Sequence, residues 1–314
     1  MKRKSLFLSV AIILIASIAL MGCGKKEYLS MLTGGTGGTY YPLGGGMAKV
    51  INDETDSVEI DAKSSNASAD NVKALQDEQD ELAFVQTDVV ANAVEGINAF
   101  EGNKVENVQA VGSLYPETIQ IVTTEETGIE SVEDLEGKTV SVGAPGSGTA
   151  VNAEQILEIH GMTFDDIDAQ NLEFEESTSG IKDGNIDAAF ITAGTPTGSV
   201  EGLGATEDVS IVPISQDKVD ELIEKYPYYA ADSVEEGTYG LEEDVNTVAV
   251  LAMLAVTDSL DEDIVYEITK AIYENTDKIG HEKAKEITLD TALDGIGIDL
   301  HPGAAKYFEE EGIK

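Results

Sequence analysis

The sequence has little that could build a metal or redox site, because it contains one cysteine and three histidines in 314 residues. A single cysteine excludes disulfides within the chain and cysteine-rich metal sites. His160, His281 and His301 have neither the spacing of a zinc site nor that of a catalytic triad. No EF-hand spacing of acidic residues appears either. These absences favour a protein with no metal, no cofactor and no enzymatic activity.

Positive charge is scarce, and Arg3 is the only arginine. Once Lys2, Arg3 and Lys4 are set aside, 16 of the 19 basic residues remain against 60 acidic ones, a formal charge of −44. Nucleic acids and anionic membrane surfaces bind through basic patches, so neither is expected as a partner. The acidic residues are spread along the whole chain. This distribution is typical of a hydrated surface adapted to high salt, where screening weakens self-repulsion.

The first 23 residues predict where the protein is found. A basic leader precedes an apolar run, residues 6–20, that is short for a membrane span and typical of a signal peptide. The run ends in Leu20-Met21-Gly22-Cys23, which resembles the bacterial lipobox. We therefore expect residues 1–22 to be a lipoprotein signal peptide. Cys23 then carries a lipid that anchors the protein to the outer face of the cell membrane.

Two glycine-rich turns dominate the rest of the chain. They are Gly34-Gly35-Thr36-Gly37-Gly38-Thr39-Tyr40-Tyr41 and Gly143-Ala144-Pro145-Gly146-Ser147-Gly148-Thr149. Each follows a strand-like run and opens a helix-like one, so each directs backbone N–H groups and a positive helix end at whatever lies in front. The two turns together are interpreted as the halves of one anion-binding site.

The succession of elements indicates an α/β protein of two similar lobes. Strands are expected at 28–32, 58–62, 82–85, 108–114, 118–123, 138–142, 186–191 and 247–256. Helices are expected at 41–51, 69–76, 89–95, 149–160, 261–275, 279–287 and 304–311. Alternating strands and helices predict mostly parallel sheets covered by helices. The last block, which has no glycine loop, is expected to return to the first lobe and create a hinge.

The predicted domains are therefore a first lobe of residues 23–118 and 214–314 and a second lobe of residues 119–213. In open α/β sheets ligands bind beyond the carboxyl ends of strands, and the polar loops of both halves fall there. These loops include Gln86-Thr87-Asp88 in the first half and Thr192 to Thr197 in the second.

Catalytic and nucleotide-binding interpretations fit the glycine loops poorly. Neither loop has the lysine of a phosphate-binding P-loop, and Tyr40 stands where the dinucleotide fingerprint needs glycine. Pro145 breaks the nucleophile-elbow pattern around Ser147. A tight strand-to-helix turn explains one such loop equally well, but two in equivalent positions favour ligand binding.

The candidate site is assembled from hydroxyl groups, an amide, glycine backbone and two tyrosines beside the loops. No arginine is available for the ligand, so neutral donors or a lysine must hold an anion. The predicted ligand-binding residues are Thr36, Gly37, Gly38, Thr39, Tyr40, Asn66, Gln86, Thr87, Tyr115, Ser147, Gly148, Thr149, Thr192 and Thr195.

The mature sequence resembles the TAXI family of solute receptors, which serve TRAP transporters. The resemblance rests on residues 34–46 (GGTGGTYYPLGGG), 82–88 (LAFVQTD), 114–117 (LYPE), 134–149 (DLEGKTVSVGAPGSGT), 183–190 (DGNIDAAF) and 300–308 (LHPGAAKYF). It implies a type II periplasmic-binding-protein fold whose two lobes close on a ligand. It also implies delivery of a small carboxylate, glutamate-like or a dicarboxylate, to a TRAP membrane permease. The turn at residues 64–68 departs from the family's usual Gly-Ser pair.

Two other functions remain open at this point. A substrate-binding lipoprotein of an ABC importer would share the fold and the lipid anchor. A ligand-sensing module of a membrane signalling protein would share the lobes but would not support uptake.

Overall fold

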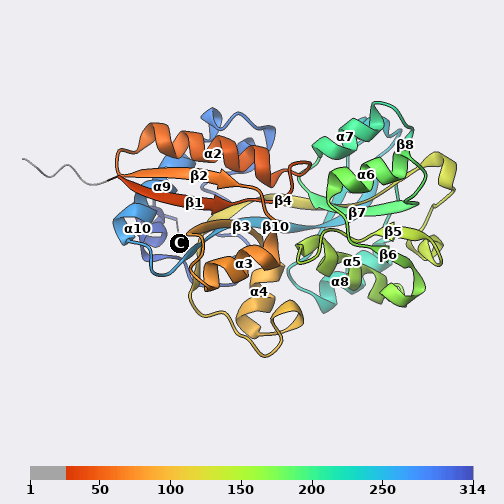
Figure 1. Cartoon of the computed structure of the whole chain (residues 1–314), viewed down its shortest axis with the longest axis horizontal. Coiled ribbons are helices and arrows are strands. Elements are labelled where there is room, and N and C mark those ends of the chain that lie inside the picture. Colours follow the sequence, from red (N-terminus) through yellow and green to blue (C-terminus); the bar gives the residue numbers. More distant parts are fainter. Residues whose placement is uncertain (1–25, 314) are drawn as a thin grey trace, which may run out of the picture.

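Two lobes lie side by side and are joined by long strands that run through both (Figure 1). The computed structural model describes residues 26–313. The predicted signal peptide and the lipid site at Cys23 lie outside these residues. Within residues 26–313, no helix is long and apolar enough to cross a membrane.

The first lobe has a sheet covered by helices on both faces. Its elements are β1 (Glu27–Leu32), α2 (Tyr40–Glu54), β2 (Val58–Lys63), α3 (Ser68–Gln76), β3 (Leu82–Gln86), α4 (Thr87–Glu95), α9 (Glu262–Glu274) and α10 (Pro302–Glu310). Successive residues of β3 point to opposite faces. Phe84 packs with the core under α2, α9 and α10, whereas Ala83 and Val85 pack with the core over α3 and α4. The lobe is therefore a three-layer α/β/α sandwich.

The second lobe repeats this arrangement with a different set of elements. They are β5 (Thr139–Ser141), α5 (Gly148–Ile159), β6 (Asp168–Gln170), α6 (Phe174–Lys182), β7 (Ala188–Ala193), α7 (Gly198–Gly204), β8 (Val209–Ile211), α8 (Gln216–Lys225) and β9 (Ala230–Val234). Phe190 of β7 packs in the core with α5 and α8, and Ile191 packs in the core with α6 and α7.

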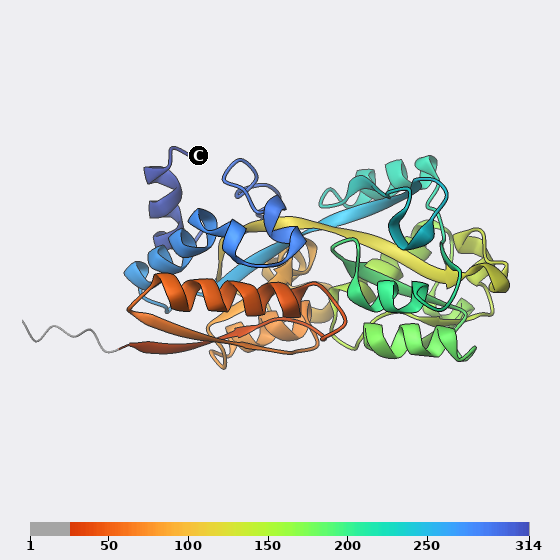
Figure 2. The ribbon, with the colours of Figure 1, turned by 90° about the horizontal axis from the view of Figure 1, so that it is seen from above.

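Two strands pass between the lobes, β4 (Val108–Thr124) and β10 (Val245–Thr257) (Figure 2). They pair antiparallel, and the strand order is β2-β1-β3-β10-β4-β7-β5-β6. Pairing is parallel inside each lobe and antiparallel at β4 and β10. The α/β fold of two lobes is thus confirmed, with one mixed sheet rather than two separate ones. The pairing shifts register between Leu251 and Met253, at the level of the crossing.

The second crossing lies later in the chain than the sequence analysis expects. Ile214, Val219 and Leu222, assigned there to the first lobe, are buried in the core of the second. The amphipathic helix α8 packs against α5, and β9 pairs with β10. The chain therefore returns to the first lobe along β10.

Two further expectations differ from the structure. The segment 279–287 was expected to be a helix but forms only a short 3-10 helix, Glu282–Glu286. Strands 108–114 and 118–123 form the single strand β4, which continues through Pro116.

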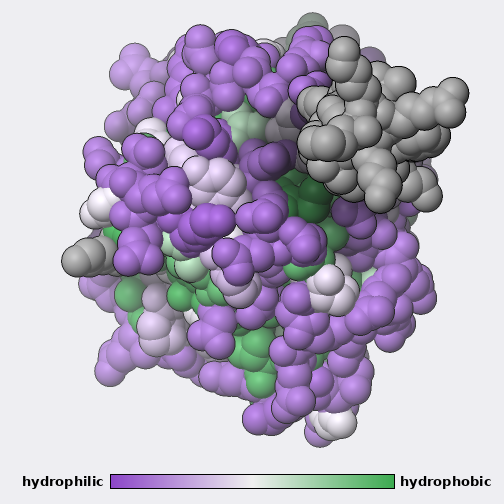
Figure 3. All heavy atoms as spheres, turned by 90° about the vertical axis from the view of Figure 1, so that its left-hand side faces the viewer, coloured by the Kyte–Doolittle hydropathy of each residue, from purple (hydrophilic) through white to green (hydrophobic). Residues whose placement is uncertain are grey.

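The surface at the end of the first lobe is mostly hydrophilic, with small separate hydrophobic areas (Figure 3).

Candidate functional site

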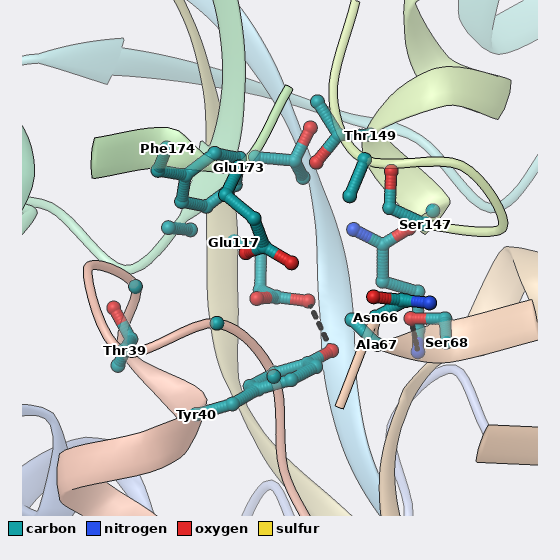
Figure 4. Close-up of a pocket in the computed structure, with 18 residues that line it drawn as sticks. Thr39, Tyr40, Asn66, Ala67, Ser68, Glu117, Ser147, Thr149, Glu173 and Phe174 are labelled. Carbon is teal, nitrogen blue, oxygen red and sulfur yellow. Dashed lines mark hydrogen bonds between the residues drawn. The ribbon is translucent and has the colours of Figure 1, made fainter. Parts of the chain in front are cut away.

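A cavity lies between the lobes, beside both glycine-rich loops (Figure 4). It contains about 490 Å³ of space free of atoms, part of which is open to solvent. The lining residues are Gly34, Gly35, Gly38, Thr39, Tyr40, Asn66, Ala67, Ser68, Gln86 and Glu117 together with Ala144, Ser147, Gly148, Thr149, Glu173, Phe174, Thr192 and Ala193. Both lobes therefore contribute to one site.

The first glycine loop leads from β1 into α2, whose first residue is Tyr40. Thr39 occupies the N-cap position, but its side chain makes no capping hydrogen bond. Its hydroxyl donates instead to the carbonyl of Gly194 in the second lobe, at 3.3 Å. The N–H groups of the first turn are thus not capped by that side chain, and this helix end borders the cavity.

The second glycine loop leads from β5 into α5. Gly143 and Gly146 adopt left-handed backbone angles, with φ of 92° and 78°, which glycine accepts without strain. The Ser147 hydroxyl caps α5 by accepting a hydrogen bond from the N–H of Ala150, at 3.2 Å. Its oxygen is therefore engaged in the helix, while its hydrogen remains for a ligand acceptor.

The glycines of each loop are in close contact with side chains of the opposite lobe. A Cβ on Gly35 would lie 2.0 Å from the Glu173 carboxylate, and one on Gly148 would lie 1.7 Å from the Gln86 amide oxygen. Both distances are far below van der Waals contact. A larger residue at either position would therefore force the facing side chain, Glu173 or Gln86, to move.

Glu117, on β4, is the buried acid of the site, with a side chain that is 2% exposed. The hydroxyl of Tyr40 donates to its Oε2 at 2.6 Å. Burial raises the pKa of Glu117 to about 8, and this rise is opposed by the Tyr40 hydrogen bond and increased by the charge of Asp88. The carboxyl group is therefore mostly protonated near neutral pH in this state of the protein.

Glu173 and Phe174 enter the cavity from the start of α6. The carboxylates of Glu117 and Glu173 point into the same space, with Phe174 beside Glu173 (Figure 4). Burial raises the pKa of Glu173, and the neighbouring acids Glu176 and Glu175 raise it further. The cavity thus contains two carboxyl groups, that of Glu117 on the crossing strand β4 and that of Glu173 at the start of α6 in the second lobe.

Gln86 ends β3 and lies almost fully buried, at 3% exposure. Its Oε1 is buried without a hydrogen-bond partner among the described residues. This oxygen lies against Gly148 of the second lobe, and a buried amide oxygen without a donor costs about 1–3 kcal/mol.

Hydrogen bonds between the lobes hold the site closed. The N–H of Ala69 donates to the carbonyl of Gly146 at 3.0 Å, and that of Ser199 to the carbonyl of Gly37 at 3.2 Å. Asn152 on α5 donates to Asp88 on α4 at 3.0 Å. The lobes are therefore in direct contact around the cavity.

Most of the sequence-predicted residues come together at this cavity. Those that line it are Gly38, Thr39, Tyr40, Asn66, Gln86, Ser147, Gly148, Thr149 and Thr192. Their positions are as expected for a shared site, and their contact with a ligand stays a prediction.

Five predicted residues do not line the cavity. Thr36 and Gly37 line an outer groove beside Glu175 and Ser199. Thr87 is buried at the start of α4, and Tyr115 is buried in the first-lobe core, outside the lining. Thr195 precedes the cis peptide bond to Pro196 and also lies outside the lining.

Four residues that line the cavity are not among those predicted from the sequence: Glu117, Glu173, Phe174 and Ser68. Glu117 lies two residues after Tyr115 at the lobe crossing, so the alternation of strand side chains offered a signal. The helix α6 was not expected at all, and nothing in the local sequence placed Glu173 opposite the first loop.

Solved structures with this fold support the two-lobe architecture. The alkanesulfonate-binding protein SsuA from Xanthomonas axonopodis pv. citri, bound to MOPS, is 12% identical with a TM-score of 0.53, covering 90% of this chain and 83% of that one. PhnD1 from Prochlorococcus marinus (MIT 9301), in complex with methylphosphonate, is 12% identical with a TM-score of 0.55, covering 91% and 97%. A structure described as a periplasmic transporter is 13% identical, with a TM-score of 0.55 and coverage of 92% and 94%. At these identities the likeness establishes the fold.

A match to a family model covers nearly the whole described chain. The match spans residues 31–312, from β1 past the end of α10, and so includes both glycine loops and both crossing strands. The chain therefore belongs to the NMT1-like family.

Proposed function

We propose that this protein is an extracytoplasmic solute receptor that captures a small ligand by closure of its lobes and delivers it to a membrane transporter. One observation supports this most: a single cavity is lined by glycine loops from both lobes and bordered by hydrogen bonds between them. A ligand in that cavity would stabilise the closed state over the open one. In this proposal the protein binds its ligand without chemical change.

The ligand is proposed to carry a carboxylate. Ser147, Gly148 and Thr149 lie at the N-terminus of the twelve-residue helix α5 and line the cavity. Backbone N–H groups, hydroxyl hydrogens and the positive helix end suit a small anion. A receptor of micromolar affinity needs about 8 kcal/mol, which several such hydrogen bonds and burial of the ligand can supply.

The membrane partner is proposed to be the permease of an ABC importer. Two solved structures of this fold support this choice: the alkanesulfonate-binding protein SsuA, bound to MOPS, and PhnD1 in complex with methylphosphonate, ligands that carry a small anionic group. The TRAP permease, predicted from the sequence motifs, is the other candidate. Uptake into vesicles that contain the cognate permease separates them, because an ABC importer requires ATP and a TRAP transporter requires an ion gradient.

Anchoring through Cys23 is proposed on the lipobox-like sequence alone. Mass spectrometry of the membrane fraction would detect diacylglycerol on the N-terminal cysteine. Cys23→Ser would release the protein from the membrane if the anchor exists.

Calorimetry tests the receptor function directly. We expect at least one compound from a panel of amino acids, dicarboxylates, sulfonates and phosphonates to bind at micromolar concentration. Absence of binding across the panel, by a protein that unfolds cooperatively, would contradict the proposal.

A further inference from the structure

We propose, building on the receptor function above, that Asp88 is a proton-dependent latch between the lobes: its carboxyl group favours the closed state when protonated and opposes it when ionised. Acid therefore favours closure, and capture of the ligand with it. The latch is separate from the ligand cavity, because neither Asp88 nor its partner Asn152 lines that cavity. Three observations support it.

The first observation is the position of Asp88 where the two lobes meet. It lies in the first turn of α4, in the first lobe, and α4 packs beside α5 of the second lobe (Figure 1). The side-chain amide of Asn152 on α5 donates to Asp88 Oδ2 at 3.0 Å, and both residues are 0% exposed. Because this partner belongs to the other lobe, separation of the lobes breaks the hydrogen bond and returns the carboxyl group to water.

The second observation is that the second lobe holds Asn152 in place by itself. The Asn152 amide also donates to the Tyr229 hydroxyl at 2.9 Å, and its oxygen accepts from the Thr192 hydroxyl at 3.0 Å. The Tyr229 hydroxyl donates in turn to Gln155 at 2.7 Å. The donor for Asp88 is thus oriented by neighbours in its own lobe. Thr192 lines the ligand cavity, so the same network connects the latch with the ligand site.

The third observation is the lack of an opposite charge. Asp88 takes part in no salt bridge within residues 26–313. The ionisable groups that face it are Tyr228 and Tyr229 after α8 and Glu117 on β4, and none of them is cationic. Its Oδ1 is buried without a hydrogen-bond partner among the described residues. A carboxyl group in such surroundings is much less costly to bury neutral than charged.

The protonation of Asp88 and closure of the lobes are therefore linked. Burial raises the pKa of Asp88 to about 7 in the closed arrangement, against the lowering effect of hydrogen bonds from the Val89 N–H, the Asn152 amide and its own N–H. An aspartate exposed to water has a pKa of about 3.9. The closed state thus binds a proton that the open state has lost between these pH values. For this group alone, the closed-to-open ratio should fall about 50-fold from pH 5 to pH 7.

Pulsed electron paramagnetic resonance between spin labels on the two lobes tests the latch in the unliganded protein. Cys23 is the only cysteine, so Cys23→Ser gives a background for labels at Lys49→Cys on α2 and Lys182→Cys on α6, both exposed positions. We expect the closed population to fall as pH rises from 5 to 8. A second label pair within the first lobe, Lys49→Cys and Glu309→Cys, should keep its distance at every pH.

Variants assign the effect to the latch. Asp88→Asn imitates the protonated acid in shape and charge, so it should stay closed up to pH 8 and lose the 50-fold dependence expected for this group. Asp217→Asn, at an exposed position on α8, is the matched control and should keep the wild-type pH dependence, which separates the latch from general repulsion between acidic residues. Asn152→Ser removes the donor of the second lobe. It should open the lobes more at pH 8 than at pH 5, because a hydrogen bond to an ionised group is the stronger one.

A wild-type closed population that stays constant from pH 5 to pH 8 would overturn the latch, and so would an unchanged pH dependence in Asp88→Asn. If Asp88→Asn does not unfold cooperatively, Asn152→Ser decides, and equal opening at both pH values would overturn the latch. These measurements need no ligand. Their failure would leave the receptor function intact, and absence of binding across the compound panel would contradict the receptor function alone.

Discussion

The two glycine loops are alike in composition and differ in what faces them. The first loop lies against the acidic side chains of Glu173 and Glu175 from the second lobe. The second lies against Gln86 and Asp70 from the first lobe, with the neutral amide on the cavity side. The same motif therefore borders an acidic end of the cavity in one lobe and a more neutral end in the other. A glycine loop lets the backbone come close to other groups, and the side chains of the opposite lobe determine the charge of the surroundings.

The acidic end should make stability depend on pH. The pKa of Glu117 is about 8 in the folded protein and about 4.5 as a reference carboxyl group. Between these pH values the folded state holds a proton that the unfolded state has lost, so stability falls as pH rises from about 5 to 8, by about 1.4 kcal/mol per pH unit for this group. Thermal unfolding of the unliganded protein at several pH values measures this.

Glu117→Gln should reduce that dependence, and Glu175→Gln should retain it, which separates the buried acid from general repulsion between acidic residues. Burial raises the pKa of Asp88 to about 7. Asp88 should therefore leave a residual slope of the same sign in Glu117→Gln. Parallel pH profiles for the wild type and Glu117→Gln would contradict the first expectation.

Substitution of Gly148 in the second loop should weaken ligand binding more than substitution of Gly38 in the first. Gly148→Ala places a Cβ 1.7 Å from the Gln86 oxygen, so Gln86 must move and the affinity for ligand should fall about 30-fold, or about 2 kcal/mol. Gly38→Ala meets the Phe174 ring at 3.4 Å, an ordinary contact, and should change affinity less than about threefold. Calorimetry with the best ligand from the panel compares them. Equal losses of affinity would contradict this ranking of the two positions.

Loss of a threonine hydroxyl should likewise weaken ligand binding more at the second loop than at the first. Thr149→Ala removes a donor at the neutral end and is expected to weaken binding about tenfold. Thr39→Ala removes a 3.3 Å hydrogen bond to Gly194 between the lobes and is expected to weaken binding about threefold. Titrations of both variants against Thr36→Ala, which lies outside the cavity, test this ranking. A larger loss for Thr39→Ala would place the anion at the first loop.

The smallest effect concerns the backbone beside the first loop. Ala67 has φ of 68° and ψ of −152°, a conformation that glycine takes easily and alanine does not. Ala67→Gly should therefore raise the free energy of unfolding by about 1 kcal/mol. Ala74→Gly, in the interior of α3, should lower it by about the same amount. Denaturant unfolding measures both, and a loss of stability in Ala67→Gly would show that the alanine is not strained.

Local signals in the sequence predicted much of the fold. Glycine loops between apolar runs located the starts of α2 and α5, and helical spacing located α9 and α10 to within a few residues. The helix predicted at 279–287 is not observed, because this part of the chain forms short 3-10 helices instead. The helices α6, α7 and α8 were missed, and with them Glu173 and Phe174.

The sequence by itself determined the α/β class, the two glycine loops and the lack of any arginine for the ligand, because these depend on residue type and on contacts near in the chain. Only the tertiary structure decided which groups share the cavity. Glu117 comes from a crossing strand, Gln86 from the first lobe and Glu173 from the second, and no local pattern relates positions so distant in sequence. Their charges and protonation depend on burial between the lobes, which arises only when both lobes fold and meet.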